Sequence, residues 1–545
     1  MRCRIIAVAA ALAGSVATVH ARPEPVFRLV ARSGDAFPGR PGATYDASLG
    51  NPFIGARPID PSGDLYFTAF ARLGDGSRID DILVYRRATG TVEPYVHSEN
   101  GVGALANFWG VVGGWQAGTM TFVGELENHT ASERLAVMVQ HADGTRVVAA
   151  EVKGQVPGQP AGTTFTTVGR TSAAFMDVNM NATGVVSYGG QFTGAGGSAR
   201  TGYYITRPGG APERIIDSTM PVPNRSGATW VNYDGIGAPF DIYTPGLDDN
   251  GDAYFKAKYR LAGKDYRAFY KRTSDGAITA IVDGADANAV PGLPGHGFSR
   301  ISTSANNRRG DVAMGAEITK PDGSFAGTGV FAARAGGAVS RLLTWADPVP
   351  GIPEAVDHSP NLIAMSNTGH ILVTDNYFLT YPTGKLGGQS LVLFNPDGTA
   401  EPVLKFNETP GFPGQRAGLT TAADLNSRGD AVFITRMNMT GNIHACFAYL
   451  HDTGELVPIL KTGDTLLGKT VVIMSLGGGA NDPLGSIGAS AGPVSWDDAR
   501  NLSLNVTLKD AAGNESYAIY AVQVPAPAIG AVLTAAPAFM GRRRS

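Results

Sequence analysis

The stretch Asn426-Ser-Arg-Gly-Asp-Ala-Val-Phe433 decides the fold, because a turn-forming Asn-x-x-Gly leads directly into alternating apolar residues. An Asn side chain hydrogen-bonds its own backbone and Gly accepts a positive φ, so Asn-x-x-Gly predicts a tight hairpin. Ala431 and Phe433 stand at every second position after the turn, which predicts a strand with one face in a core.

This pattern recurs along the chain with Asp, Asn or Ser in the first position, and we call each copy an anchor. Clear anchors are Asp60–Gly63, Asn181–Gly184, Asp248–Gly251, Asn307–Gly310, Ser366–Gly369 and Asn426–Gly429, and degenerate ones lie around Gly118 and Arg500. Successive anchors are 55 residues apart at the least (Gly63 to Gly118) and 71 at the most (Gly429 to Arg500). A pattern that recurs along nearly the whole chain is the sequence signature of a repeat architecture.

Each anchor has the same companions. The anchor at Ser366–Gly369 is followed by the apolar segments Leu391–Phe394 and Pro402–Leu404, and a short strand such as Phe298–Ile301 precedes several anchors. Each unit is therefore expected to be a meander of about four strands. A lone sheet of this kind cannot bury both faces, and repetition around an axis gives a β-propeller.

The last unit lacks its third strand before the chain reaches its C-terminal tail. The third strand and exit turn around Leu460–Asp464 recur at the start of the chain around Phe27–Asp35. We therefore expect residues 26–30 to pair with residues 517–522 and close the ring. The prediction is an all-β propeller of about eight four-stranded blades, and seven blades or two smaller β domains remain as alternatives.

Residues 1–21 have the three parts of a secretory signal peptide. Arg2 and Arg4 precede an apolar run, and small residues end it at Ala21. The run is too short for a membrane-spanning helix. Cys3 lies in this signal, so Cys446 is the one cysteine of the mature chain, which excludes a disulfide framework and a structural zinc-thiolate site.

Residues 525–545 predict a second processing signal. A Pro-rich motif and an apolar stretch from Ala528 to Gly541 precede a basic end; the candidate motif residues are Val524, Pro525, Pro527, Arg542, Arg543 and Arg544. The basic cluster would hold the end of the apolar stretch on the cytoplasmic side. This tail resembles the PEP-CTERM sorting signal, although Ala526 stands where that signal usually has Glu. The resemblance implies an exosortase-like processing enzyme and membrane contact before processing, and a permanent short anchor is the alternative.

The repeat itself, over nearly all of residues 22–524, resembles the tandem-repeat family known by the motif N-x-x-G-x-x-A-F. That resemblance implies export and surface display, and it brings no catalytic residues with it. A formal net charge of −3 gives no argument for nucleic acid as a partner. An extracellular polysaccharide or protein is the expected kind of ligand.

Three patterns carry potential chemistry, and each has a structural interpretation that we favour. Ser490 stands in a G-x-S-x-G match without the strand-to-helix context of a hydrolase. The oxygen-bearing residues Asp248, Asp249, Asn250 and Asp252 do not have EF-hand spacing, so calcium is a minor alternative to a hairpin. The aromatic residues Phe108, Trp109 and Trp115 favour core packing over a carbohydrate-stacking patch.

The mature chain's histidines are scattered and show no paired-ligand spacing. We therefore predict no catalytic, metal-binding or cofactor-binding residue. Two classes of function remain: a non-catalytic display or binding module, which the lack of a compact catalytic signature favours, and an extracellular glycan hydrolase or lyase with carboxylates at the propeller axis.

Overall fold

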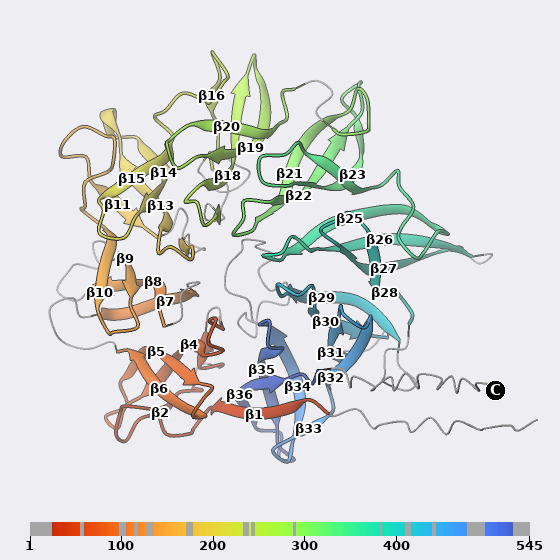
Figure 1. Ribbon diagram of the computed structural model, residues 1–545. Helices are drawn as coiled ribbons and strands as arrows, with labels where there is room; N and C mark the ends of the chain where they lie inside the picture. Colours follow the sequence, from red (N-terminus) through yellow and green to blue (C-terminus); the bar gives the residue numbers. More distant parts are fainter. Residues whose placement is uncertain are drawn as a thin grey trace, which may run out of the picture.

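The computed structural model describes residues 24–526, apart from residues 49, 55–58, 98–104, 114–117, 127–134, 170–177, 233–238, 241–245, 287–289, 382–383, 409–411, 413–415, 439–442 and 477–495. Within these residues the regular elements are strands and one 3-10 turn, Ala195–Gly197. The strands form eight antiparallel sheets, which Figure 1 shows arranged around a common axis. No helix in the described part of the chain is both long and apolar enough to cross a membrane.

The sheets follow one another in chain order, and we number them as blades. Blade 1 holds β2 (Thr44–Tyr45), β3 (Phe53–Ile54), β4 (Leu65–Arg72), β5 (Arg78–Arg86) and β6 (Thr91–Val96), and blade 2 holds β7 (Leu105–Gly113), β8 (Met120–Leu126), β9 (Leu135–Gln140) and β10 (Arg146–Glu151). Blade 3 holds β11 (Phe165–Val168), β12 (Val178–Met180), β13 (Val186–Thr193), β14 (Ala199–Thr206) and β15 (Pro212–Asp217). Blade 4 holds β16 (Thr229–Trp230), β17 (Gly246–Leu247), β18 (Ala253–Leu261), β19 (Lys264–Arg272) and β20 (Ile278–Asp283).

The second half of the ring repeats the plan with unbroken first strands. Blade 5 holds β21 (Gly297–Asn306), β22 (Val312–Thr319), β23 (Phe325–Ala333) and β24 (Ser340–Thr344), and blade 6 holds β25 (Ala355–Met365), β26 (Ile371–Tyr381), β27 (Gly384–Phe394) and β28 (Ala400–Leu404). Blade 7 holds β29 (Ala417–Leu425), β30 (Ala431–Met437), β31 (Ile443–Leu450) and β32 (Glu455–Lys461). The predicted eight-bladed propeller is confirmed.

Blade 8 is assembled from both ends of the repeat region. It holds β33 (Thr465–Leu466), β34 (Lys469–Leu476), β35 (Asn501–Lys509) and β36 (Glu515–Gln523), and β1 (Val26–Arg32) pairs antiparallel with β36 as its outer strand. Val26 lies opposite Gln523 and Leu29 lies opposite Tyr520. Figure 1 shows β1, in red, on the outer side of the blue sheet. The predicted closure by an N-terminal strand is therefore confirmed.

Alternate residues of one strand pack against opposite neighbouring blades. In β4, Leu65 and Phe67 belong to a core cluster that includes Ile519 of blade 8. Tyr66, between them, belongs to a cluster with Phe122 of blade 2. Because every blade lies between two others, both faces of its sheet are buried, and this need for two neighbours makes the ring the stable unit.

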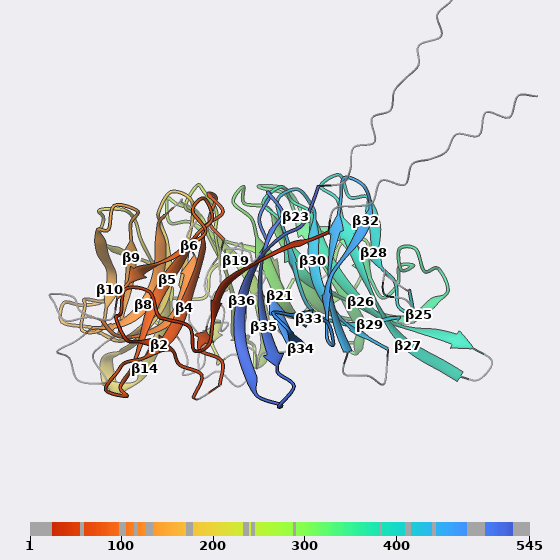
Figure 2. The same ribbon diagram turned by 90° about the horizontal axis from the view of Figure 1, so that it is seen from below.

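The two ends of the ring carry different connections. Since the strands of a blade alternate in direction, the anchors lie at one end, which we call the anchor face. The turns between the second and third strands and the connectors between blades lie at the other end, the connector face. Figure 2 shows the ring from the side, with the strands running between these two faces.

Candidate functional site

The anchors are built as the sequence predicts. Asn426 Oδ1 accepts hydrogen bonds from the backbone N–H groups of Arg428 and Asp430, both at 3.0 Å, and Gly429 has a φ of 84°. Oxygens of the first residue accept the same pair of N–H groups in the anchors that begin with Asp60, Asn181, Asp248 and Asn307. The recurrent Asp and Asn side chains therefore satisfy buried backbone donors.

The same side chains also join neighbouring blades, which the sequence did not reveal. The amide Nδ2 of Asn181 donates to the carbonyl of Asp248 at 2.7 Å. The amide of Asn307 reaches the carbonyl of Ser366 at 3.3 Å, and that of Asn426 reaches the carbonyl of Asp497 at 3.0 Å. Ser366 and Asp248 begin the next anchors and Asp497 begins the degenerate one around Arg500, so these hydrogen bonds link three pairs of neighbouring anchors; we call these links the girdle.

Two clear anchors begin with Asp, and each has a partner six residues later that explains the difference. The hydroxyl of Tyr66 donates to Asp60 Oδ2 at 3.1 Å, and the hydroxyl of Tyr254 donates to Asp248 Oδ2 at 3.0 Å. The anchors that begin with Asn have Ser187, Ala313 and Val432 at this position. The first residue of an anchor is therefore Asp instead of Asn in the two clear anchors where a tyrosine hydroxyl donates to its second carboxylate oxygen.

The calcium candidates are occupied by protein donors. Asp248 accepts two backbone N–H groups besides the Tyr254 hydroxyl, and burial raises the pKa of Asp248. Asp252 pairs with Lys271 at 2.6 Å and accepts the N–H of Ser274 at 2.8 Å. Among the described residues no group of three or more His, Cys, Asp or Glu side chains is placed to hold a metal ion.

The sequence did not predict the histidine pairings; His97 Nδ1 lies 2.9 Å from Asp81 Oδ2, and two further pairings involve the buried rings of His358 and His370. In blade 6, His358 Nδ1 lies 2.8 Å from Asp375 Oδ2, and its Nε2 lies 2.5 Å from the carbonyl of Asp347. Burial alone would lower the pKa of His358, but Asp375 and the carbonyl raise it overall. Because the Asp347 carbonyl accepts a hydrogen bond from Nε2–H and Asp375 holds Nδ1, the ring has no free nitrogen with which to act as a general base.

The second pairing lies between blades 6 and 7. The rings of His370 and His451 are 5.0 Å apart, and Glu401 Oε2 is 3.5 Å from His451 Nδ1. Burial, followed by the nearby charge of His451, lowers the pKa of His370 to about 4, so this ring is neutral at pH 7. His370 directly follows the glycine of its anchor, as Asp311 and Asp430 follow the glycines of theirs. It is therefore a variant of a position that the repeat uses to build its hairpin.

A pocket on the connector face is the feature that the repeat does not explain. It has a volume of about 600 Å³ and lies between blades 3 and 4. Its walls come from the β13–β14 hairpin, from the connector that follows β15, and from β16; the lining residues are Gln191, Ala199, Arg200, Thr201, Ser218, Thr219, Met220, Pro221, Ala228, Thr229, Trp230, Asn232 and Pro239. This volume is within the range of small-molecule sites in proteins.

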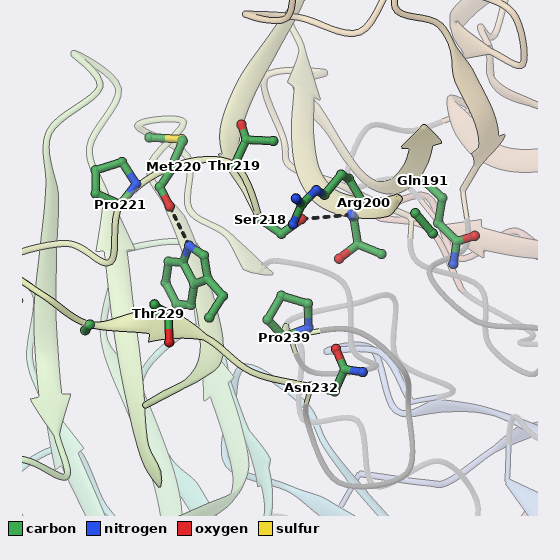
Figure 3. A pocket seen from close by; sticks show the side chains of 13 residues that line it. Gln191, Arg200, Ser218, Thr219, Met220, Pro221, Thr229, Asn232 and Pro239 are labelled. Carbon is green, nitrogen blue, oxygen red and sulfur yellow. Dashed lines mark hydrogen bonds between the residues drawn. The ribbon is translucent and has the colours of Figure 1, made fainter. Parts of the chain in front are cut away.

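One aromatic and one basic side chain dominate the pocket. The indole Nε1 of Trp230 donates to the carbonyl of Met220 at 2.7 Å, which is the dashed line beside Met220 in Figure 3. Figure 3 also shows Arg200 directed toward Ser218, whose hydroxyl accepts the N–H of Thr201 at 3.3 Å. The described lining contains no Asp, Glu, His or Cys side chain, so it offers no acid, base or thiol for catalysis.

The other sequence candidates lie elsewhere. Phe108 and Trp109 are on β7, the first strand of blade 2. Ser490 and Trp115 lie outside the described residues, as do the predicted signal peptide, Pro527 and the basic cluster Arg542–Arg544. Val524, the first residue of the predicted sorting motif, is buried and donates its N–H to the carbonyl of Arg500 at 3.0 Å, so it packs against blade 8.

The fold, with its N-terminal closing strand and its girdle of anchors, defines the chain as an eight-bladed β-propeller. It belongs to a family of unknown function, DUF7453, whose model matches residues 180–484, more than half of the 545-residue chain. No curated protein matches the sequence.

Solved structures with a similar arrangement include other proteins of low sequence identity. The polysaccharide lyase Uly1 is 9% identical, with a TM-score of 0.33 and coverage of 74% of this chain and 88% of the lyase. The Dos1 propeller is 7% identical, with a TM-score of 0.33 and coverage of 91% and 95%. An oligogalacturonate lyase from Vibrio parahaemolyticus is 10% identical, with a TM-score of 0.32 and coverage of 92% and 98%. At these values we draw no functional conclusion from them.

Proposed function

We propose that this chain is an exported, surface-displayed β-propeller that works as a non-catalytic binding scaffold for an extracellular polymer. Export rests on the signal pattern of residues 1–21, and display rests on the sorting pattern of residues 525–545 with its exosortase-like processing enzyme. Both segments adjoin blade 8, where Val26 and Gln523 lie opposite one another. Processing at either end would therefore leave the ring itself unchanged.

The observation that supports the non-catalytic part of the proposal is that the recurrent polar residues already make structural hydrogen bonds. Asp60, Asn181, Asp248, Asn307 and Asn426 hold hairpins, and several of them also hold the next blade. A carboxylate that already accepts several short hydrogen bonds is poorly placed to move a proton during a reaction. The pocket between blades 3 and 4 offers binding surface without such groups.

Expression of the full chain in a bacterium with an export pathway and an exosortase tests the display part of the proposal. We expect mass spectrometry of the mature protein to give an N-terminus near Arg22 and to place the chain in the envelope fraction. Removal of residues 525–545 should shift it to the medium. An intact N-terminus on protein from the cytoplasmic fraction would contradict the proposal.

A further inference from the structure

Trp230 departs from its counterparts in the other blades. A Gly-x-x-aromatic segment leads into the first strand of four blades and ends at Tyr45, Phe165, Trp230 and Phe298. The other three aromatic residues are buried at 2 to 4% exposure, whereas Trp230 is half-buried and lines the pocket. Trp230 also packs against the core between blades 3 and 4, but the exposed part of its indole is available to a ligand in the pocket.

The indole is held in one orientation. Its Nε1 is fixed by the hydrogen bond to the Met220 carbonyl, and its ring lies 5.4 Å from that of Phe240 at an interplanar angle of 59°. These two contacts hold the ring without filling the pocket. A ring that is already oriented costs little conformational entropy on binding, so it is a good stacking platform for a flat apolar surface.

Polar groups surround this platform. Hydroxyl and amide side chains of the lining belong to Gln191, Thr201, Ser218, Thr219, Thr229 and Asn232. The Oγ1 of Thr201 is buried and has no hydrogen-bond partner among the described residues. Buried hydroxyls are normally paired, so this one is suited to a partner supplied by a ligand.

Arg200 sets the charge of the pocket. It is the one charged side chain among the described lining residues, and it makes no hydrogen bond or ion pair with any residue that the structure describes. Most other arginines near blades 3 and 4 are paired, as Arg214 is with Asp217 and Arg225 is with Asp283. An unpaired guanidinium favours a planar carboxylate, which it can bind through two parallel hydrogen bonds.

We propose that this pocket binds a short acidic oligosaccharide, with one sugar ring stacked on Trp230 and a sugar carboxylate on Arg200. A sugar ring has an apolar face and a rim of hydroxyls, which matches an indole surrounded by hydroxyl and amide groups. The proposal rests on the proposed binding function, because it names the class of polymer that the scaffold holds. The absence of acidic and histidine side chains from the described lining is consistent with binding alone.

Isothermal titration calorimetry of the mature chain with two tetrasaccharides tests the proposal. One probe consists of glucuronic acid units and the other of glucose units with the same linkage. We expect tighter binding of the acidic probe, and Arg200→Gln should weaken it about tenfold while leaving the neutral probe unchanged. Trp230→Ala should weaken both probes at least about fivefold. Trp230→Phe, which keeps the packing against Phe240, should have a smaller effect in the same direction.

Matched controls separate the pocket from general effects. Arg260→Gln removes an exposed arginine of the adjacent β18, and Phe325→Ala removes an exposed aromatic ring on blade 5; neither residue lines the pocket, and both variants should bind like wild type. No binding of the acidic probe, or binding that Arg200→Gln and both Trp230 variants leave unchanged, would overturn the inference. Mass spectrometry of the recovered probe reports separately on the proposed function, because shortened products would refute the non-catalytic scaffold even if the pocket binds.

Discussion

Replacing Asn307 by alanine should strongly destabilise the ring. Asn307 is fully buried, and its Oδ1 accepts the N–H groups of Arg309 and Asp311, both at 3.0 Å. Its Nδ2 donates to Asp311 Oδ2 at 2.8 Å and to the carbonyl of Ser366 in blade 6 at 3.3 Å. Alanine leaves the buried N–H of Asp311, the part-buried N–H of Arg309 and an inter-blade acceptor without this partner. With about 1–3 kcal/mol for each buried group left unsatisfied, and some relief from water, we expect a loss of about 3 kcal/mol.

Urea unfolding followed by tryptophan fluorescence and circular dichroism measures this loss, provided that the two probes give one transition. Asp322→Ala is the matched control in the same blade. Asp322 Oδ1 also accepts an N–H two residues later, from Ser324 at 2.9 Å, but this turn between β22 and β23 is exposed. This variant should unfold close to wild type.

A variant that keeps the hairpin separates the two roles of the anchor. Asn307→Asp retains an acceptor for the N–H groups of Arg309 and Asp311, but it replaces the amide donor by a second carboxylate oxygen facing Asp311. Ala313 stands where Tyr254 compensates the aspartate of blade 4, so nothing at that position replaces the lost donor. We expect this variant to be destabilised as well. If Asn307→Ala and Asp322→Ala lowered the free energy of unfolding equally, the stabilising role of the girdle would be refuted.

Three further outcomes follow from the structure. Tyr254→Phe should lower the free energy of unfolding by about 1–2 kcal/mol at pH 7 in urea titrations, because it removes a buried donor to the Asp248 carboxylate; an unchanged midpoint would argue against that hydrogen bond. The pKa of His358 is raised in the folded state, so its contribution to stability is present below pH 6.5 and is lost as pH rises through the raised pKa. The difference in melting temperature between wild type and His358→Gln should therefore shrink over that window. A constant difference would exclude the ionised pair of His358 and Asp375. Deleting residues 22–32 should expose the edge of β36 and cause self-association in light scattering, whereas deleting residues 22–25 should not.

The sequence was sufficient for the architecture because the same local physics recurs in every blade. Asn-x-x-Gly followed by alternating apolar residues predicts a hairpin wherever it occurs, and the third strand missing after Tyr517–Val522 required a partner from elsewhere in the chain. The first strands of blades 1, 3 and 4 are broken into short pieces, such as β16 and β17, and the alternation does not predict those breaks.

The pocket could not be predicted in the same way. Arg200, Ser218 and Trp230 come from a hairpin, a connector and a short strand, and no spacing in the sequence relates them. The one available signal was Trp230 at a position where other blades have Tyr or Phe, but whether that ring faces the core or solvent depends on the neighbouring blade. The girdle was hidden for a similar reason, since contacts such as Asn307 with Ser366 join residues about one repeat apart.

Affinity electrophoresis through gels that contain alginate, an acidic polysaccharide, or dextran, a neutral one, tests the central claim most directly. The mature chain should be retarded in the alginate gel relative to the dextran gel. The viscosity of an alginate solution incubated with it should remain constant, because the scaffold binds the polymer without cleaving it. Equal migration in both gels would contradict the claim that it binds acidic polysaccharide, and a falling viscosity would contradict the claim that it is not an enzyme.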